Sequence, residues 1–475
     1  MSTPALLADA FADRLRRLAS HAPATASPDR PLLLSASLRT PPSDPIDLFA
    51  AAGSERFLWC RPSDGLALVG LGVAARLAGQ AGPSPLADRW LGLRRRTLVD
   101  ASSCSPLPAP VAVGGLAFDP LRATDPLWAS LPPGLIVPRL LYTFCGGSSW
   151  LTANVVLTPG SDFAEHPLEP IAADLRRYVE SAQAGDGLAT RGGGFTLHNH
   201  SGAGAWQQAV AEIARAIDRG EVQKVVLARR LHVSAPRAID AAAVLRRLRL
   251  GYPECSLYAY AQDGACFLGA SPERLVRVQG LHVACDPLAG SAARGATAHD
   301  DQLRATALLA DEKERREHAL VVQAIADALG PLVSALNAPR EPDLVRISNV
   351  QHLHTPIRGL LASPTNVLEL VERLHPTPAT GGLPKDRALA LIRRYEPFSR
   401  GWYAGPLGWV DGDGNGDFTV AIRSALVQGT EAYLYAGCGI VSGSDPQREY
   451  AESWLKLRAM LWALGGDASD GYGGA

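Results

Sequence analysis

The chain has 475 residues, of which 47% are hydrophobic and 20% charged, so it can form two or three average domains or one large unit. A net charge of −1, with no long run of Lys or Arg, argues against a nucleic-acid or anionic-membrane surface and favours a small-molecule partner. Seven scattered cysteines, and the lack of a signal-like segment or a run of about 18 apolar residues, predict a cytoplasmic protein with reduced thiols.

The first half of the chain has the pattern of a sheet. Short apolar runs such as PLLLSASL, LALVGLG and WLTANVVL alternate with Pro- and Gly-rich turns, which is typical of strands. The Gly-rich segment 181–205 predicts a linker. We therefore expect a sheet-rich N-terminal half over residues 1–200 that belongs to the same fold as the rest, a second region over 203–464, and a disordered tail over 465–475.

A lysine stands in an apolar strand just after the linker. A helix is predicted over 206–219 and a strand over 222–230, with Lys224 in the middle of that strand. Burial disfavours the charged form of a lysine, so Lys224 could be a neutral amine that acts as a general base. A side chain that reaches solvent from a strand end fits the pattern equally well.

The next polar candidate follows a pair of strands, SLYAYAQ and ACFLGA. Glu273 comes directly after the second strand and a Ser-Pro turn, a common position for a rigidly held catalytic acid. A salt bridge to Arg274 or to another surface cation is the more ordinary interpretation of Glu273 taken alone.

Residues 296–330 predict one long helix, because they are rich in Ala, Leu, Glu and Arg and have no interior Pro or Gly. Steps of three and four place Glu314 and Glu317 on one stripe with Val321 and Ile325. The apolar pair marks this stripe as the inward face. Two acids are therefore expected to point into the protein.

The segment between this helix and the C-terminus alternates strands and helices. A strand is predicted around 350–357, helices around 367–374 and 385–394, and hairpin strands after them. Arg423 is expected in mid-strand, where a buried guanidinium needs a planar anion, either a substrate carboxylate or an internal acid. The interleaved pattern indicates an α+β fold with large antiparallel sheets in layers and helices outside.

The last predicted helix, 446–464, carries a second acidic stripe. Glu449, Glu452 and Lys456 share a face that continues into apolar residues. Buried carboxylates are costly unless cations meet them, and two such faces aimed at one interior suit Mg²⁺. Solvated faces with ordinary ion pairs remain the alternative for either helix alone.

From about residue 206 to 464 the chain resembles the chorismate-utilising enzymes, and among them the isochorismate synthases. The motifs that carry this resemblance are QKVVLAR, FLGASPERLV, DPLAGSAARG, EKERREHALVVQAI, NVQHLHTPI, LHPTPATGG, RGWYAGPLGW, VAIRSAL, YAGCGIV and PQREYAESWLK. The N-terminal half matches only loosely. The resemblance implies the fold of anthranilate synthase component I, with both halves around one Mg²⁺-containing cleft and residues 203–464 as the chorismate-binding catalytic region.

The resemblance also implies roles for individual residues. Glu317 and Glu452 match the metal ligands, and Glu314 and Glu449 would be supporting acids. The positions that match substrate-binding residues, together with the cleft histidine His352, are Gly290, Ser291, Ala379, Tyr403, Arg423, Gly437 and Lys456.

The implied reaction is an isomerisation of chorismate to isochorismate, which would feed siderophore, salicylate or menaquinone synthesis. Lys224 would activate water as the base, and Glu273 would protonate the departing hydroxyl as the acid. Relatives that aminate chorismate have Gln where Lys224 stands, and the aminodeoxychorismate type has a nucleophilic Lys where Ala289 stands. Salicylate synthases have Thr where this chain has Ala379. Water is therefore the expected nucleophile, and pyruvate should be retained.

Two alternatives stay open: a salicylate synthase that goes on to eliminate pyruvate, and a non-catalytic chorismate-binding paralogue. We expect a monomer that needs no glutaminase subunit. Ser291 and Ala292 stand where many relatives have Thr and Arg, which bears on substrate affinity rather than on reaction type.

Overall fold

The computed structural model describes residues 4–21, 31–79, 85–102, 104–122, 125–157, 169–183, 194–198 and 203–466. Much of the predicted linker, and the predicted tail from residue 467 onward, lie outside the described residues. All structural statements below refer to the described parts of the chain.

The N-terminal half contributes seven strands and four helices among its described residues. They are α1 (Pro4–Ser20), β1 (Leu32–Thr40), α2 (Pro45–Ala51), β2 (Arg56–Arg61), the 3-10 turn η1 (Pro62–Asp64), β3 (Leu66–Ala78), α3 (Leu86–Arg94), β4 (Thr97–Val99), β5 (Ala112–Gly115), the 3-10 turn η2 (Pro126–Trp128), β6 (Gly134–Cys145), β7 (Ser148–Leu157) and α4 (Glu169–Gln183).

The second region continues the alternation of strands and helices. Its first elements are β8 (Thr196–His198), α5 (Ala203–Asp218), β9 (Lys224–Ser234), α6 (Ala241–Gly251), β10 (Ser256–Gln262), β11 (Ala265–Ser271), β12 (Arg274–Gln279), β13 (His282–Asp286), β14 (Leu288–Ala293), α7 (Ala298–Ala310) and α8 (Glu312–Leu329). The remainder are the 3-10 turn η4 (Gly330–Leu332), β15 (Val333–Asn337), β16 (Asp343–Arg346), β17 (Val350–His354), β18 (Ile357–Leu361), α9 (Val367–Leu374), β19 (Gly382–Leu383), α10 (Lys385–Tyr395), β20 (Pro406–Val410), β21 (Gly416–Val420), β22 (Ser424–Gln428), β23 (Glu431–Ile440) and α11 (Pro446–Ala463).

The strands form one extensive sheet system, antiparallel except for the parallel pair β1–β4, and a small separate sheet, β14–β17–β16. The pairings run β1–β7–β6–β3–β2–β10–β11–β22–β23–β9, and a second series runs from β6 through β5–β20–β21–β12–β13–β18–β15. The pairs β2–β10 and β5–β20 join the two halves of the chain. The α+β class predicted from the sequence, with large antiparallel sheets, is confirmed.

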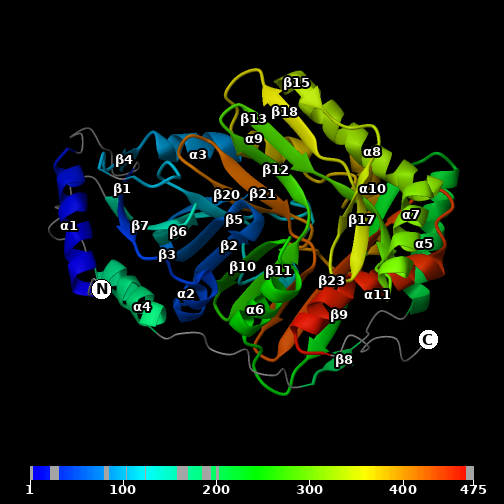
Figure 1. Cartoon of the computed structure of the whole chain (residues 1–475), viewed down its shortest axis with the longest axis horizontal. Coiled ribbons are helices and arrows are strands. Elements are labelled where there is room, and N and C mark those ends of the chain that lie inside the picture. The colour runs from blue at the N-terminus through cyan, green and yellow to red at the C-terminus, as the bar shows by residue number, and fades with distance from the viewer. Residues whose placement is uncertain are drawn as a thin grey trace.

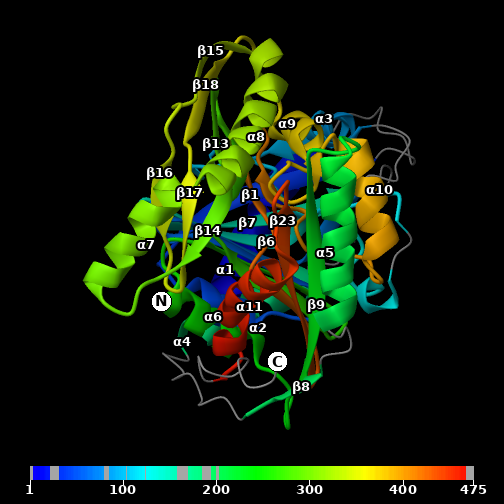
Figure 2. The same cartoon turned by 90° about the vertical axis from the view of Figure 1, so that its right-hand side faces the viewer.

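Helices cover the outside of the sheets. Figure 1 shows α5, α7, α8, α10 and α11 gathered on one side of the molecule, and α1 and α4 on the opposite side. In the turned view of Figure 2, α5 runs beside β9 and α8 passes over β14. No helix in the described ranges combines the length and hydropathy needed to cross a lipid bilayer.

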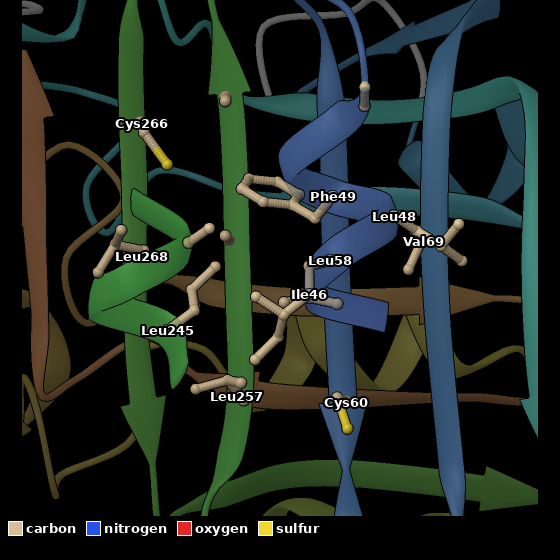
Figure 3. Close-up of a cluster of buried hydrophobic side chains, with 14 of the residues drawn as sticks. Ile46, Leu48, Phe49, Leu58, Cys60, Val69, Leu245, Leu257, Cys266 and Leu268 are labelled. Atoms are coloured by element: carbon tan, nitrogen blue, oxygen red, sulfur yellow. The ribbon is translucent and has the colours of Figure 1, made fainter. Parts of the chain in front are cut away.

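A hydrophobic core lies where α2 and α6 pack on the central strands. Figure 3 shows Ile46 and Phe49 of α2 and Leu245 of α6 facing Leu257 of β10, and all four side chains are fully or almost fully buried. The α2 helix begins where the Asp44 carboxylate accepts hydrogen bonds from the N–H groups of residues 46 and 47. This packing fixes the central strands relative to one another and so supports the site beyond them.

The prediction of a single helix over 296–330 is wrong. The structure has two helices, α7 and α8, which meet at Asp311. Asp311 has extended backbone angles, and its carboxylate accepts hydrogen bonds from the N–H groups of Lys313 and Glu314. It is therefore the N-cap of α8, and the acidic stripe begins in the first turn of a new helix.

Candidate active site

One cavity collects almost all of the site residues singled out in the sequence. It lies among β9, β14, β17, β23, α8 and α11, beside the junction of β11 and β12. The singled-out residues that line it are Glu273, Gly290, Ser291, Glu317, His352, Ala379, Tyr403, Arg423, Gly437, Glu452 and Lys456. Three of the singled-out residues lie outside its lining: Lys224, which contacts Glu317, and Glu314 and Glu449, which line an adjoining pocket together with Ser291 and Glu452.

Lys224 is completely buried, and its Nζ lies 2.8 Å from Oε1 of Glu317. It is the first residue of β9 rather than a mid-strand residue. Gly439 of β23 makes room for the pair, because a Cβ atom there would lie 2.2 Å from Glu317 Oε1 and 3.0 Å from Lys224 Cε. The sequence predicted that the Lys224 amine would be buried among apolar residues. The structure instead places it in contact with the Glu317 carboxylate.

Glu273 stands in the short break between β11 and β12, as the sequence predicts, and only 3% of its surface is exposed. Its N–H donates to Ser271 Oγ, and its carbonyl oxygen accepts from Thr419 Oγ1 at 2.6 Å and from the N–H of Val420 at 3.1 Å. Burial raises the pKa of its carboxyl group to about 8. Near neutral pH Glu273 is therefore protonated and able to donate a proton.

Four glutamates from two helices form an acidic cluster at the cavity: Glu314 and Glu317 of α8, and Glu449 and Glu452 of α11. Burial, and then the charge of Glu317, raises the pKa of Glu314 to about 7. Burial and then Glu452 likewise raise the pKa of Glu449. Burial would also raise the pKa of Glu317, but the neighbouring Lys224, with Lys456 and Lys313, outweighs burial and lowers that pKa. The inward acidic faces predicted for both helices are present.

Three of the four lysines in the sequence neutralise part of this cluster. Besides Lys224, Lys313 Nζ lies 2.8 Å from Glu449 Oε1 and 3.3 Å from Glu314 Oε1. Lys456 Nζ lies 2.6 Å from Glu452 Oε1 and donates to the Gly437 carbonyl at 2.9 Å. The bridging role of Lys313 was not predicted from the sequence, although its place next to Glu314 in α8 was visible.

A polar chain of three residues crosses another wall of the cavity. Arg423 donates to His352 Nε2 at 2.9 Å, and His352 Nδ1 lies 2.9 Å from Ser291 Oγ. Burial and then the Arg423 charge hold the pKa of His352 well below its ordinary value, so the ring is neutral. Because arginine only donates, the ring proton must be on Nδ1, which donates to Ser291. The Ser291 hydroxyl proton can then point at a ligand.

Arg423 is not in mid-strand, contrary to prediction. The expected strand is interrupted between β21 and β22, and Arg423 there has φ of +55°, in the left-handed region. The Tyr258 hydroxyl donates to the carbonyl of Ile422 at 2.8 Å, which holds the bend. The bend directs the guanidinium toward His352 and the Lys456 carbonyl instead of an internal acid.

Sequence reasoning missed Arg400, which also lines the cavity. Its buried guanidinium pairs with Glu396, donates to the carbonyls of Thr380 at 2.8 Å and Val226 at 2.7 Å, and lies over the ring of Tyr403. It stands at the start of the RGWYAGPLGW motif, and that position was the only available signal. Arg400 fixes the loop that carries Ala379 beside the cavity.

Gly290 completes the wall formed by β14. Its φ of +77° favours glycine, and the β14–β17 register shifts there. The shift lets the N–H of Ser291 donate to Glu314 Oε2 at 3.0 Å. The bulge thus ties the β14 wall of the cavity to the acidic cluster.

Comparison with known proteins places this geometry in context. A family model described as chorismate binding enzyme matches residues 18–465. A salicylate biosynthesis isochorismate synthase of Pseudomonas aeruginosa is 38% identical over 444 residues, which cover 92% of this chain and 91% of that protein. The isochorismate synthase MenF of Bacillus subtilis is 35% identical over 448 residues, covering 92% and 94%.

The structural comparison agrees. The solved structure of MenF, the menaquinone-specific isochorismate synthase from Escherichia coli, matches with a TM-score of 0.74 at 28% identity, covering 96% of this chain and 99% of that one. The match extends over both halves of the chain, as do the family model and the two sequence relatives, so the N-terminal half belongs to the family more clearly than its motifs indicated.

Proposed function

This chain belongs to the chorismate-binding enzyme family, and from that premise we propose that it is an isochorismate synthase, an isomerase that converts chorismate to isochorismate. The single observation that carries the proposal is the meeting of a buried protonated acid, Glu273, and a buried lysine–glutamate pair, Lys224–Glu317, at one cavity. One relative is a salicylate biosynthesis isochorismate synthase and another is menaquinone-specific, which supports a product that serves salicylate or menaquinone synthesis.

The reaction needs one group that takes a proton from water and one that gives a proton to the departing hydroxyl. Lys224 is proposed as the base, with the Glu317 carboxylate 2.8 Å away to stabilise the ammonium that forms. Glu273 is proposed as the acid, because its pKa of about 8 keeps it protonated at neutral pH. Since the protons gained and lost balance, the enzyme needs no redox cofactor.

The residues present fit a bound Mg²⁺. Carboxylate oxygens of Glu449 and Glu452 lie within 4.8 Å of each other, a crowding of acidic groups that a divalent cation would relieve, and carboxylate oxygens are the ligands that Mg²⁺ prefers. Glu317 and Glu452 would hold the ion, with Glu314 and Glu449 in support. The ion would supply positive charge for a substrate carboxylate and for charge that develops on the ring.

The remaining lining residues would bind the substrate. Arg423 and Lys456 offer cations for its carboxylates, and Tyr403, stacked on Tyr435 with 5.1 Å between ring centroids, offers a rigid wall. Ala379 puts only a methyl group where the salicylate synthases have a hydroxyl. We therefore infer that pyruvate stays attached to the product.

A product assay tests this proposal. The purified chain alone, with chorismate and MgCl2, should yield isochorismate by chromatography, and Lys224→Ala should abolish this without loss of folding. Lys385→Ala is the control, because Lys385 lies outside the cavity and donates to the carbonyl of His375; it should stay active. Salicylate as the main product would indicate the lyase, and calorimetric chorismate binding without turnover would indicate a non-catalytic paralogue.

A further inference from the structure

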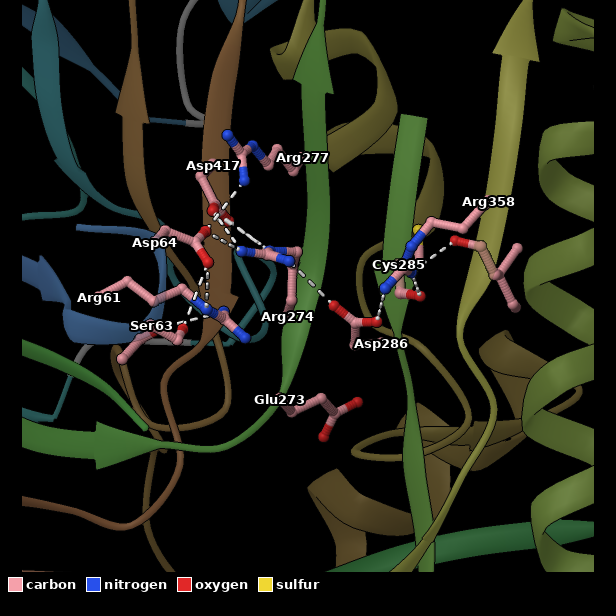
Figure 4. A network of polar contacts seen from close by, with 12 residues as sticks. Arg61, Ser63, Asp64, Glu273, Arg274, Arg277, Cys285, Asp286, Arg358 and Asp417 are labelled. Atoms are coloured by element: carbon pink, nitrogen blue, oxygen red, sulfur yellow. Dashed lines mark hydrogen bonds and ion pairs between the residues drawn. The ribbon is translucent and has the colours of Figure 1, made fainter. Parts of the chain in front are cut away.

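An ionic network lies directly beside the proposed acid. Figure 4 shows Arg274 between Asp64 and Asp417 on one side and Asp286 on the other, while Glu273 is directed away from them. The members come from separate parts of the fold: Asp64 from η1, Arg274 from β12, Asp286 from the end of β13, and Asp417 from β21. The more ordinary interpretation of the sequence was a salt bridge between Glu273 and Arg274. In the structure, Arg274 instead pairs with three aspartates.

The guanidinium of Arg274 uses each of its nitrogen atoms. Nε donates to both oxygens of Asp417 at 3.2 Å, Nη1 to Asp286 at 3.0 Å, and Nη2 to Asp64 at 2.6 Å. Its pKa is raised: burial opposes this, but Asp417 and then the other acids outweigh burial. Because every guanidinium nitrogen of Arg274 donates a hydrogen bond, these bonds hold its side chain in a single conformation.

Further cations balance the three aspartates. Arg277 Nη1 donates to Asp64 at 2.9 Å, and Arg358 Nη2 donates to Asp286 at 2.6 Å. Arg61 lies 3.9 Å from Asp64 and donates to Ser256 at 3.0 Å. Asp64 and Arg61 belong to the N-terminal half, so the network crosses between the two halves of the chain.

Glu273 and Arg274 are adjacent residues at the start of β12. Contacts that hold the Arg274 side chain in place therefore also restrict the backbone of Glu273. The backbone of Glu273 is held to β21 by Thr419 and Val420. The Arg274 side chain holds the other side of the same short segment to η1 and β13. Together these contacts fix the direction in which the Glu273 carboxyl leaves the backbone.

We propose that Asp64, acting through Arg274, is a positioning residue for the Glu273 carboxyl, so that the N-terminal half takes part in the acid step. The inference rests on the proposed function, since it assigns Glu273 the role of acid. Asp64 itself lines no part of the cavity. Its side chain is about one-fifth exposed, so it can be altered without opening the protein interior.

The variant Asp64→Asn tests the proposal, because it removes the charge and keeps the shape. Displacement of an acid from its reacting position is costly, so kcat should fall roughly tenfold while KM changes less than about twofold. Asp64→Glu, which restores a carboxylate, should recover part of the loss. Asp64→Ala serves as a second variant should Asp64→Asn fold poorly.

Asp119→Asn is the matched control. Asp119 makes an equally close pair with Arg393, at 2.6 and 2.8 Å, away from the cavity. Both variants should lower the melting temperature, but only Asp64→Asn should lower kcat. Equal effects of the two variants on kcat, or an unchanged kcat in Asp64→Asn, would overturn the proposal.

A measurement independent of turnover separates this inference from the proposed function. The infrared band of the protonated Glu273 carboxyl, identified by its loss in Glu273→Gln, should disappear near pH 8 in the unaltered protein. The charged groups that act on Glu273 are Lys224, Lys456 and Arg423, and the Asp64→Asn substitution leaves all three in place. Burial raises the pKa of Glu273, so if Asp64→Asn loosens the segment between β11 and β12 and admits water, the carboxyl should titrate at lower pH in that variant. An unmoved band would refute the positioning role, even if the protein made no isochorismate.

Discussion

Glu273 and Lys224 are both buried, but their surroundings differ in the way that acid–base catalysis requires. Glu273 has its pKa raised by burial, which favours the neutral acid. Lys224 Nζ lies 2.8 Å from a carboxylate oxygen of Glu317, which would stabilise the positive charge that the amine gains when it takes up a proton. The two environments therefore suit the two opposite proton transfers of the proposed reaction.

The pH dependence of turnover follows from Glu273. Its carboxyl must be protonated to act, and its pKa in the ligand-free protein is about 8, so kcat/KM should fall as the pH rises through that value. Glu273→Gln should lower kcat by about 10²–10⁴-fold. Steady-state assays between about pH 6 and 10 check the profile. A kcat/KM that stays level well above pH 8 would exclude Glu273 as the acid.

At the residue scale, the motifs that carry the family resemblance pointed to most of the residues that line the cavity. They did not reveal the Lys224–Glu317 contact or the left-handed backbone of Arg423, since both depend on which strands and helices become neighbours. The partners of Arg400 were hidden for the same reason.

The acidic faces of α8 and α11 are the elements on which the metal proposal depends. A cation between the helices would bind only the folded state and so stabilise it, by about 2.7 kcal/mol when Mg²⁺ is a hundredfold above its Kd. Calorimetry should therefore show a melting temperature that rises with Mg²⁺, and EDTA should abolish both the rise and the activity.

Two variants make the Mg²⁺ prediction specific. Glu452→Gln should lose the Mg²⁺-dependent rise, whereas Glu341→Gln should keep it, because Glu341 is an exposed acid paired with Arg315. A rise of equal size in both variants would place the cation elsewhere.

The break between α7 and α8 shows what the helix prediction overlooked. Helix-forming composition and the absence of Pro and Gly suggested one helix, yet Asp311 with Glu314 three residues later has the spacing of an N-terminal capping motif. The acidic stripe was nevertheless predicted correctly, because the spacing of Glu314, Glu317 and Val321 lies wholly within α8.

On the scale of the whole molecule, the two halves are one structure. β2 pairs with β10 along five residues and β5 with β20 along four, so neither half has a complete sheet without the other. Local sequence patterns predict strands but not which distant strands pair. The α+β class was therefore predictable, whereas the joining of the halves was not.

This pairing predicts that residues 203–464 do not fold alone. The unpaired edges of β10 and β20 would expose hydrogen-bonding groups and apolar side chains, and the fragment should aggregate. Co-expression with residues 1–200 should restore a soluble complex, as judged by gel filtration and circular dichroism. A monomeric, cooperatively melting 203–464 fragment would contradict this prediction.

The scarcity of lysine has a practical consequence for chemical labelling. Of the 46 basic residues only four are lysines, and three of these contact the acidic cluster. An acylating reagent that spares guanidinium groups therefore has few side-chain targets outside the catalytic region. Mass-spectrometric mapping of Lys456, the lysine that lines the cavity, with and without chorismate, would report on occupancy of the cavity.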